Sequence, residues 1–391
     1  MGGPLEGLRV ADFSKLVQGP SATQFLGDMG ANVFKIEPRG GDWQRNWAIY
    51  DKYIKGESVS FLAFNRAKRS ITLNLKDPRG KEIAMRVIKS SDVLVENFRP
   101  GVMDRLGLGY EELSKVHPQL IYCASCGWGQ DGPYKTRPGQ DLLAQAVAGV
   151  LTLNGKVSDP PMPIGIGVAD LTAALHITIG VLAALYRRKE TGQGQRVDVN
   201  LLNSLMSLAT QELTLFLNTA IEPQRSAVGV GHPYAGAPMG VYKTKDGYMV
   251  VAMMPIGKIA ELVGVEGFEG NDSRNVIENR DEVKRKLEPA FARKTTAELM
   301  DIFMAADMWA APVNSFPDVE RDPQVQHNEA IISFEHPVAG KFRTIGPPMK
   351  FSRTPTSIQR PPLLGEHTTQ ILSELGYSSD EIAELKKDQV V

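Results

Sequence analysis

Alternation between apolar strand-like runs and amphipathic helical runs most constrains the fold, and it continues to about residue 130. The run LRVADF predicts a strand at residues 8–13, SATQFLGDMG predicts a helix that ends at Gly30, and NVFKIE predicts the next strand. Further strand-like runs follow at 70–75, 91–98 and 120–129. Strands that alternate with helices predict an α/β fold, in which helices cover both faces of a parallel sheet.

The opening strand–helix–strand unit is of the kind that binds nucleotides. Glu37 closes the second strand, where an acidic residue holds a ribose in dinucleotide-binding folds. However, the turn after the first strand reads SKLVQGPSAT and lacks the GxGxxG glycines. The sequence therefore argues against an enzyme that uses NAD or FAD.

Composition narrows the class of protein. The chain has 391 residues, 42% of them hydrophobic, which suggests two domains or one large domain with an insertion. Its 44 basic and 45 acidic residues leave a formal net charge of −1, which argues against a nucleic-acid surface or a polybasic membrane patch. No signal peptide is recognisable at the N-terminus, and the apolar stretch around 171–186 is expected to be too short and too mixed to span a bilayer. We expect a soluble, cytoplasmic protein.

The segment GIGVAD places Asp170 directly before a long apolar run that predicts a helix ending at Gly192. Asp is a good N-cap, and a helix with so little polar surface is expected at the centre of a domain. Gly165 and Gly167 let the chain lie close to whatever faces that carboxylate. From the local sequence, Asp170 is either a helix cap only or a cap that also performs chemistry.

The character of the sequence changes near residue 221. A Gly- and Pro-rich linker at 221–240 precedes a hairpin with Asp246-Gly247 at its turn, followed by highly charged helical sequence at 278–306. These patterns predict a small α+β domain at 222–316, inserted between a first large part at 1–221 and a return at 317–391. The return is expected to hold strands near 331–335 and 340–345 and two terminal helices.

Cysteine chemistry receives little support. Cys123 and Cys126 form a single CxxC in a predicted strand, without a second CxxC or a histidine at ligand spacing. Residues three apart on a strand also face opposite sides of the sheet. We therefore expect neither a metal site nor a redox disulfide.

Six segments in order resemble one family: the opening PLEGLRVADFSKLVQGPSATQFLGDMGANVFKIEP, then NRAKRSITLNLKDPRGK, DVLVENFRPGVMDRLGLGYEEL, GVAD, TGQGQRVDVNLL and PPLLGEHTTQIL. Together they resemble the class III CoA-transferases, the group that includes formyl-CoA transferase and carnitine CoA-transferase. The resemblance implies a Rossmann-like large domain built from both chain ends, an inserted small domain, and two chains interlocked as a homodimer.

The resemblance also implies a mechanism in which Asp170 is a covalent nucleophile. Its carboxylate would attack an acyl-CoA to give a mixed anhydride and then an aspartyl-CoA thioester, from which CoA moves to an acceptor carboxylate. Gln18 and backbone N–H groups near it and near Gly165 and Gly167 would stabilise the oxyanions. On this reading no metal and no tightly bound cofactor is needed, and the partners are acyl-CoA, a small organic acid and a second copy of the chain.

The family pattern also implies residues that hold CoA, since its phosphates require cations and its other groups require close backbone. The residues that match are Val17, Arg39, Leu73, Lys76, Asn97, Phe98, Arg99, Arg105 and Asp141. Taken singly, each basic residue is as readily a solvated surface charge. Asp141 matches a position that is acidic in relatives, and it either orients the surroundings of the nucleophile or is an ordinary helix acid.

Departures from the family leave alternatives open. Formyl-CoA transferase has a run of glycines that the comparable VGVGHPYAGAPMG lacks, so formate or oxalate is not implied, and the acyl donor and acceptor stay unidentified. His232 in this loop either contacts substrate or supports the turn. An α-methylacyl-CoA racemase would need a titratable residue where Gln140 stands, and glutamine cannot be a base. A non-catalytic CoA-binding protein would not need Asp170.

Overall fold

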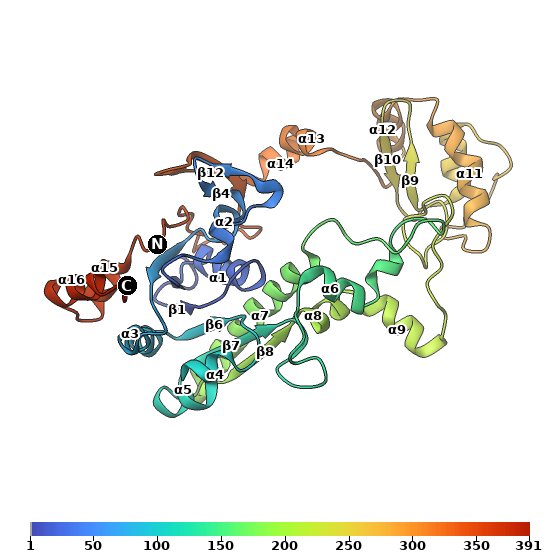
Figure 1. Cartoon of the computed structure of the whole chain (residues 1–391). Helices are drawn as coiled ribbons and strands as arrows, with labels where there is room; N and C mark the ends of the chain where they lie inside the picture. Colours follow the sequence, from blue (N-terminus) through green and yellow to red (C-terminus); the bar gives the residue numbers. More distant parts are fainter. Residues whose placement is uncertain (1) are drawn as a thin grey trace. The chain divides into compact units, whose positions relative to one another are not determined.

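The structure is a computed structural model that describes residues 2–391, and the chain divides into two compact units (Figure 1). The first unit consists of the chain up to Ala144 together with Gly167–Leu208 and Pro323–Val391. The second consists of Gln145–Ile166 and Ala209–Asp322. The expected segments were 1–221, 222–316 and 317–391. Compared with the expected small domain at 222–316, the second unit also includes residues 145–166, and its longer segment begins at residue 209. The division into folding domains itself stays a prediction.

A six-stranded parallel sheet forms the centre of the first unit, which confirms the predicted α/β fold class. Its strands are β1 (Arg9–Asp12), β2 (Asn32–Glu37), β5 (Lys68–Thr72), β6 (Val93–Glu96), β7 (Ile121–Cys126) and β8 (Arg196–Asn200). Their order, β5-β2-β1-β6-β7-β8, reverses between β1 and β6. Ligands of doubly wound sheets bind outside the carboxyl ends of the strands at such a reversal. The topology therefore directs attention to the loops after β1 and β6.

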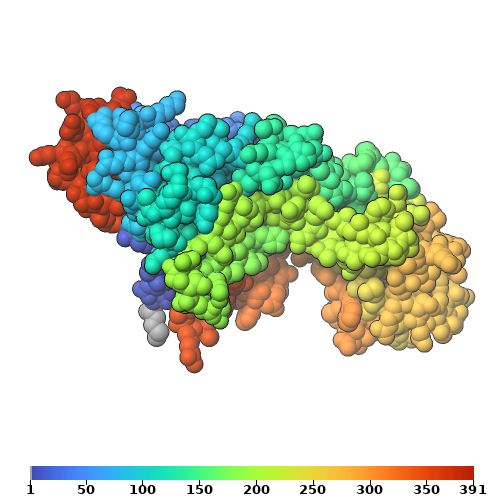
Figure 2. Space-filling view, turned by 90° about the horizontal axis from the view of Figure 1, so that it is seen from below, coloured from blue at the N-terminus to red at the C-terminus, as the bar shows by residue number. Residues whose placement is uncertain are grey.

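Helices cover both faces of this sheet. On one face, α3 (Pro78–Lys89), α15 (Thr368–Glu374) and α16 (Ser379–Lys387) share a buried apolar cluster with strand residues such as Ala11 and Phe34. Figure 2 shows the red C-terminal helices beside the light-blue segment that contains α3. On the other face lie α1 (Gln18–Asp28) and α7 (Val168–Thr191), which pack against each other. The two terminal helices and the early strands, far apart in sequence, thus build one core.

Helix α7 differs from expectation because it is not buried at the centre of a domain. Its inner side packs against α1, α8 (Leu201–Leu208), β7 and β8, whereas Leu175, Ile179 and Tyr186 are 51%, 61% and 71% exposed. The expectation that this stretch is too short and mixed to span a bilayer is also wrong, since α7 has the length and composition of such a span. In this chain one side of α7 covers the sheet and the other is apolar and uncovered.

Short elements lie between the longer strands and helices of the first unit. After β2 come η1 (Trp43–Arg45), η2 (Ile49–Asp51), the β3–β4 hairpin (Tyr53–Ile54 and Glu57–Ser58) and α2 (Val59–Phe64), and after β6 come α4 (Val102–Leu106) and α5 (Tyr110–Val116). Local signals fix them: the Ser58 hydroxyl accepts from Phe61 N to cap α2, and positive φ at Gly101 and Gly107 bounds α4. They are too short for hydrophobic periodicity to reveal.

The second unit contains an antiparallel sheet in the order β11-β10-β9, formed by Ala310–Pro312, Tyr248–Val251 and Gly240–Lys243. The β9–β10 pairing confirms the predicted hairpin. Helices α10 (Ile256–Val263), α11 (Arg280–Phe291) and α12 (Thr296–Ala305) accompany this sheet. Helices α11 and α12 confirm the predicted helical sequence at 278–306, whereas α10 was not predicted. Tyr242 stacks on Phe291 with ring centroids 4.3 Å apart, at the centre of an apolar cluster.

The remaining elements are α6 (Asp141–Val147), η3 (Val150–Leu153), α9 (Thr210–Thr219), α13 (Phe316–Arg321), α14 (Pro323–His327), β12 (Ile331–His336) and β13 (Gly340–Ile345). Strands β12 and β13 pair antiparallel, which confirms both expected strands, and α15 and α16 confirm the two terminal helices.

Candidate active site

The loop after β1 lies at the reversal of strand order and is fixed by the residue that follows β6. Lys15 N donates to Asn97 Oδ1 at 2.7 Å, and Asn97 Nδ2 donates back to Lys15 O at 2.8 Å. The Lys15 ammonium lies 5.0 Å from the centroid of the Phe98 ring. The structure therefore brings the predicted Asn97 and Phe98 against the loop that leads to Gln18.

Gln18 is the first residue of α1, and Val17 is its N-cap without a side-chain capping bond. The preceding Leu16 has a φ of 64°, which turns the chain sharply into the helix. Gln18 is only 8% exposed, and its Oε1 accepts a 2.6 Å hydrogen bond from the Ser125 hydroxyl on β7. Two strands and one helix N-terminus thus fix the position of the predicted carboxamide.

A buried ionic network supports this loop from below. Asp12 accepts hydrogen bonds from Ser14 N at 2.9 Å and Thr23 Oγ1 at 2.7 Å, and it pairs with Lys68 Nζ at 3.0 Å. Lys35 Nζ donates to Ser14 O at 3.1 Å. Burial opposes ionisation of Asp12, but Lys68 and Lys35 outweigh it and lower its pKa to about 2. The charges of Asp12, Lys35 and Lys68 are therefore all retained and all engaged.

Asp170 is not the N-cap of α7, contrary to the sequence prediction. Gly167 occupies that position, and Asp170 is the third helical residue. The cap is supplied by Asp141, whose Oδ2 accepts from Ala169 N at 2.7 Å and from Asp170 N at 3.0 Å. Asp141 begins α6, so only the tertiary fold brings it to this helix end. Of the two roles left open for Asp141, the structure shows contact with the backbone of Asp170.

The carboxylate of Asp170 is left available. Within residues 2–391 it accepts no hydrogen bond, and its side chain is partly exposed. Burial raises its pKa, and the negative charge of Asp141 adds to this, so that the pKa reaches about 7. A Cβ at Gly167 would lie 3.8 Å from Asp141 Oδ2 in ordinary contact, so nothing in the chain crowds that position.

The other predicted CoA-binding residues follow the carboxyl ends of their strands at the same edge of the sheet. Arg39 lies after β2, Leu73 and Lys76 lie after β5, and Arg99 and Arg105 lie after β6. The four basic side chains are exposed, whereas Leu73 is buried and Val17, Asn97 and Phe98 are partly buried. Arg39 Nη1 donates to Gln389 Oε1 at 2.9 Å. The structure thus places these residues after successive strands at one edge of the sheet.

Three residues at this edge escaped the sequence analysis: Lys15, Glu96 and Ser125. Glu96 accepts from Phe98 N at 2.8 Å, and burial raises its pKa to about 8. A polar residue that ends an apolar strand was the available signal for Glu96 and Ser125, and a cation in the first βα loop was the signal for Lys15.

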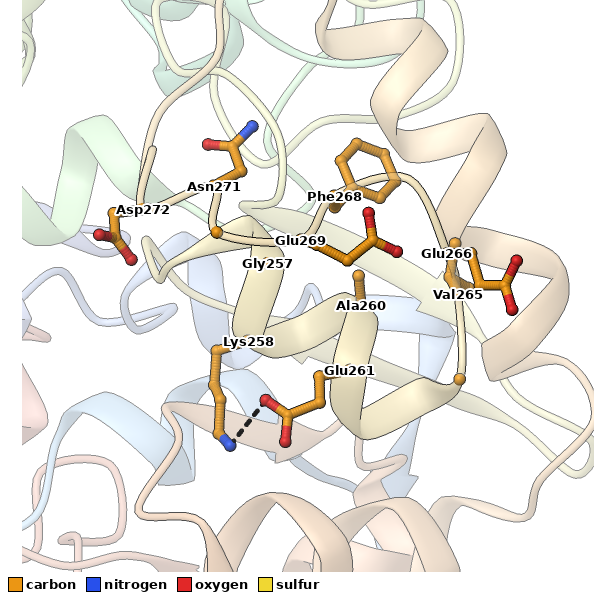
Figure 3. A pocket seen from close by; sticks show the side chains of 12 residues that line it. Gly257, Lys258, Ala260, Glu261, Val265, Glu266, Phe268, Glu269, Asn271 and Asp272 are labelled. Carbon is orange, nitrogen blue, oxygen red and sulfur yellow. Dashed lines mark hydrogen bonds and ion pairs between the residues drawn. The ribbon is translucent and has the colours of Figure 1, made fainter.

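Three further features involve none of the predicted site residues. A cavity of about 600 Å³ in the second unit is lined by residues such as Lys258, Glu261, Phe268 and Asp272, and none of the predicted site residues lines it (Figure 3). Cys123 and Cys126 are buried free thiols. Residues 2–391 contain no group of three or more His, Cys, Asp or Glu side chains placed to hold a metal ion.

Comparisons with known proteins identify the family. The family model described as CoA-transferase family III matches residues 5–368. Succinyl-CoA:glutarate CoA-transferase of Mus musculus is 36% identical over 394 residues, covering 98% of this chain and 89% of that protein. Formyl-CoA:oxalate CoA-transferase of Rhodopseudomonas palustris (strain HaA2) is 32% identical, covering 97% of this chain and 96% of that protein.

Solved structures agree with the sequence comparisons. A CAIB/BAIF family protein from Brucella suis superposes with a TM-score of 0.85 and 31% sequence identity, covering 96% of this chain and 100% of that one. The chain belongs to CoA-transferase family III. It is a CoA-transferase, whose substrates are CoA thioesters and organic acids, and the predicted resemblance is confirmed.

Proposed function

We propose that Asp170 is the covalent nucleophile that carries CoA between two carboxylic acids. Its carboxylate attacks the thioester carbonyl of the donor, forming an acyl–aspartyl anhydride and releasing the CoA thiolate. The thiolate attacks the Asp170 carbonyl, which gives an aspartyl-CoA thioester and frees the donor acid. The observation that carries this proposal is the partly exposed Asp170 carboxylate, unpaired within residues 2–391, at the start of a rigid helix.

The second half of the cycle reverses the first. The acceptor carboxylate attacks the aspartyl-CoA thioester, forming a new anhydride and releasing the CoA thiolate again. That thiolate attacks the acceptor's carbonyl, so the product acyl-CoA leaves and Asp170 returns as a carboxylate. Each step transfers an acyl group between a carboxylate and the CoA thiolate, and no tightly bound cofactor is required.

Asp141 and Gln18 support this chemistry in different ways. Asp141 occupies the N–H groups of the first turn of α7, which would otherwise stabilise the ionised form of Asp170. Together with burial, its charge raises the pKa of Asp170 and so its basicity as a nucleophile. The Gln18 amide is a donor for the oxyanion that develops on the thioester carbonyl.

For CoA itself, we propose that the carboxyl edge of the sheet is the binding surface. The exposed guanidinium groups of Arg39, Arg99 and Arg105 and the ammonium of Lys76 complement the phosphates, and Val17, Leu73, Asn97 and Phe98 contact the remaining groups. This proposal is supported by the common placement of these residues after successive parallel strands.

For the substrates, we propose succinyl-CoA as donor and a short dicarboxylic acid of the glutarate class as acceptor. Support comes from the succinyl-CoA:glutarate CoA-transferase of Mus musculus, which is similar along nearly the whole chain. Formate and oxalate are less favoured, since the glycine run is absent from the loop that contains His232. In that loop His232 Nε2 contacts Glu212 Oε1 at 2.9 Å, which favours a structural role.

We also propose the expected interlocked homodimer and a cytoplasmic location. The apolar outer side of α7 supports the homodimer, because exposed Leu175 and Ile179 would be covered by a second chain. Light scattering on the purified protein is expected to give twice the mass of the chain. A monomer that turns over at full rate would contradict the dimer.

The decisive test is chemical trapping of the covalent intermediate. Purified protein incubated with succinyl-CoA and then with hydroxylamine or borohydride is digested and examined by mass spectrometry. A modification on the peptide that contains Asp170, absent after Asp170→Asn, is the expected result. An unmodified peptide combined with deuterium exchange next to the thioester of a branched acyl-CoA would favour proton transfer and overturn the proposal.

A further inference from the structure

Ser125 makes a buried contact for which sheet formation gives no reason. It lies on β7 with no exposed surface, and its hydroxyl donates to Gln18 Oε1 at 2.6 Å. Within residues 2–391 its side chain makes no other hydrogen bond. A buried strand position would accept Ala or Val without leaving a polar atom to satisfy. The hydroxyl is therefore explained only by Gln18.

The direction of this hydrogen bond decides which way the Gln18 amide faces. A carboxamide has one acceptor oxygen and one NH₂ group with two donors. Because the Ser125 hydroxyl donates its hydrogen bond to Oε1 of Gln18, the Nε2 group of Gln18 is turned away from that hydroxyl. Within residues 2–391 Nε2 has no acceptor, and it is not among the buried polar atoms that lack partners. Two N–H donors therefore remain available at the reversal of strand order.

We propose that Ser125 is a positioning residue, which locks the Gln18 amide so that its Nε2 donates to the developing oxyanion. This inference rests on the proposed function, since the oxyanion arises when Asp170 attacks the thioester. A donor fixed before the reaction needs no reorganisation when the charge appears. Without the Ser125 hydroxyl, the Gln18 amide can rotate so that Oε1 faces the oxyanion in place of Nε2. Oε1 is an acceptor and would repel the oxyanion.

The test compares Ser125→Ala with Ser125→Thr, which keeps the hydroxyl. In Ser125→Ala we expect kcat to fall roughly 10- to 100-fold with KM nearly unchanged, because the lost orientation matters only in the transition state. Ser125→Thr is expected to restore most of kcat. Thermal unfolding of each variant shows whether it is folded at the assay temperature.

Ser70 provides a matched control. It is equally buried on β5, and its hydroxyl donates to Glu37 Oε1 at 2.7 Å and accepts from Gly365 N at 2.8 Å, so neither bond involves Gln18. Ser70→Ala is expected to leave kcat within about twofold of the parent, since neither of the bonds that it loses reaches Gln18. An equal loss of kcat in both alanine variants would assign the effect to general loosening and overturn the inference.

Two further measurements make the result independent of folding. In a Gln18→Ala background, adding Ser125→Ala is expected to change kcat no further, because both act through one donor. Gln18→Glu keeps an acceptor for Ser125 but replaces the donors by an acceptor, so its kcat is expected to fall further than that of Ser125→Ala. Independent, multiplicative losses in the double variant would contradict the coupling.

Failure of this inference is distinguishable from failure of the proposed function. If the parent protein forms no adduct on Asp170, the covalent mechanism is wrong and the inference falls with it. If the parent forms the adduct and Ser125→Ala forms it at the same rate, the covalent mechanism stands and the positioning role is wrong.

Discussion

On the same strands of the parallel sheet in the first unit, an apolar cluster lies on one face and a buried ionic network lies on the other. Ala11 pairs with Phe34 in register, and both belong to the apolar cluster under α3, α15 and α16. One residue further along, Asp12 pairs with Lys35, and both are fully buried on the face under α1. Two consecutive residues of β1 thus take part in different interactions, Ala11 in apolar packing and Asp12 in ionic bonding.

The difference separates stability from positioning. Burial of apolar surface stabilises the first face without fixing any one group. On the second face, the desolvation of buried charges offsets most of their attraction, so that such a network adds little net stability. The network does fix the position of the loop that leads to Gln18, because Asp12 and Lys35 both form hydrogen bonds with Ser14 at the start of that loop. We infer that the ionic face positions the reacting groups.

The sharpest test of this comparison changes Asp170, the proposed nucleophile, which lies on α7. For Asp170→Asn we predict a loss of turnover of roughly 10³-fold or more, because an amide cannot form the anhydride. Stability near neutral pH should not decrease. Steady-state CoA transfer and denaturant unfolding measure the two quantities. Glu381→Gln, at the same third position of α16, is the control and should retain full activity.

The second prediction concerns the ion pair inside the network. Lys68→Met removes the partner of Asp12 and leaves a buried charge uncompensated, so we expect the free energy of unfolding to fall by about 3–5 kcal/mol. Adding Asp12→Asn should recover part of that loss. Urea unfolding of single and double variants measures both effects.

The next residue along β5 provides the control for Lys68. Arg69 pairs with Glu374 at the surface, where Arg69→Met should cost less than about 1 kcal/mol. If Lys68→Met were as mild as Arg69→Met, the network would not hold the loop as we infer.

Much of the fold could be predicted from the sequence, because strand and helix periods were clear where elements were long. The strands at Arg9–Asp12 and Asn32–Glu37 and the β9–β10 hairpin were all placed within a few residues. Periodicity could not reveal α2 or α4, which have six and five residues. Nor could it show that α7 covers a sheet on one side only, since its composition is apolar all round.

The contacts around the candidate site could not be predicted from the sequence. Asp170 and Gln18 were predicted as site residues through the resemblance, whereas the local pattern left open whether Asp170 is a helix cap only. The actual cap comes from Asp141, 29 residues earlier, and the orientation of Gln18 comes from Ser125, 107 residues later. Such contacts arise from the arrangement of strands and helices in space, and no local spacing encodes them.

The third prediction tests the apolar face. Leu372 on α15 is fully buried in the cluster under the sheet, so Leu372→Ala should lower the free energy of unfolding by about 3 kcal/mol through lost burial and a cavity. The rate per folded molecule should be unchanged. Val116→Ala, at an exposed site on α5, should change stability by less than about 0.5 kcal/mol. A fall in kcat for folded Leu372→Ala would contradict the inference that the apolar face contributes to stability and not to positioning.

The smallest expected effect compares Asp170 on α7 with Asp12 on β1. The pKa of Asp170 is raised to about 7, so the folded chain holds a proton between about pH 4 and pH 7 that the unfolded chain has lost. This group therefore lowers stability as pH rises through that window. At pH 8 the free energy of unfolding of Asp170→Asn should exceed that of the parent by about 2 kcal/mol, and below pH 4 the two should be equal. The expected difference is smaller than the full value for such a pKa shift because the side chain is partly exposed.

Asp12 should show the opposite sign. Its pKa is lowered to about 2, so it adds stability above about pH 4, and this stability is lost as pH falls toward 2. Asp12→Asn should therefore be less stable than the parent at pH 7, and the gap should narrow in acid. Urea titrations from pH 3 to pH 8 measure both variants. If Asp170→Asn and Asp12→Asn shifted stability in the same direction at pH 8, the reacting carboxylate would be held as tightly as the structural one, and the contrast between them would fail.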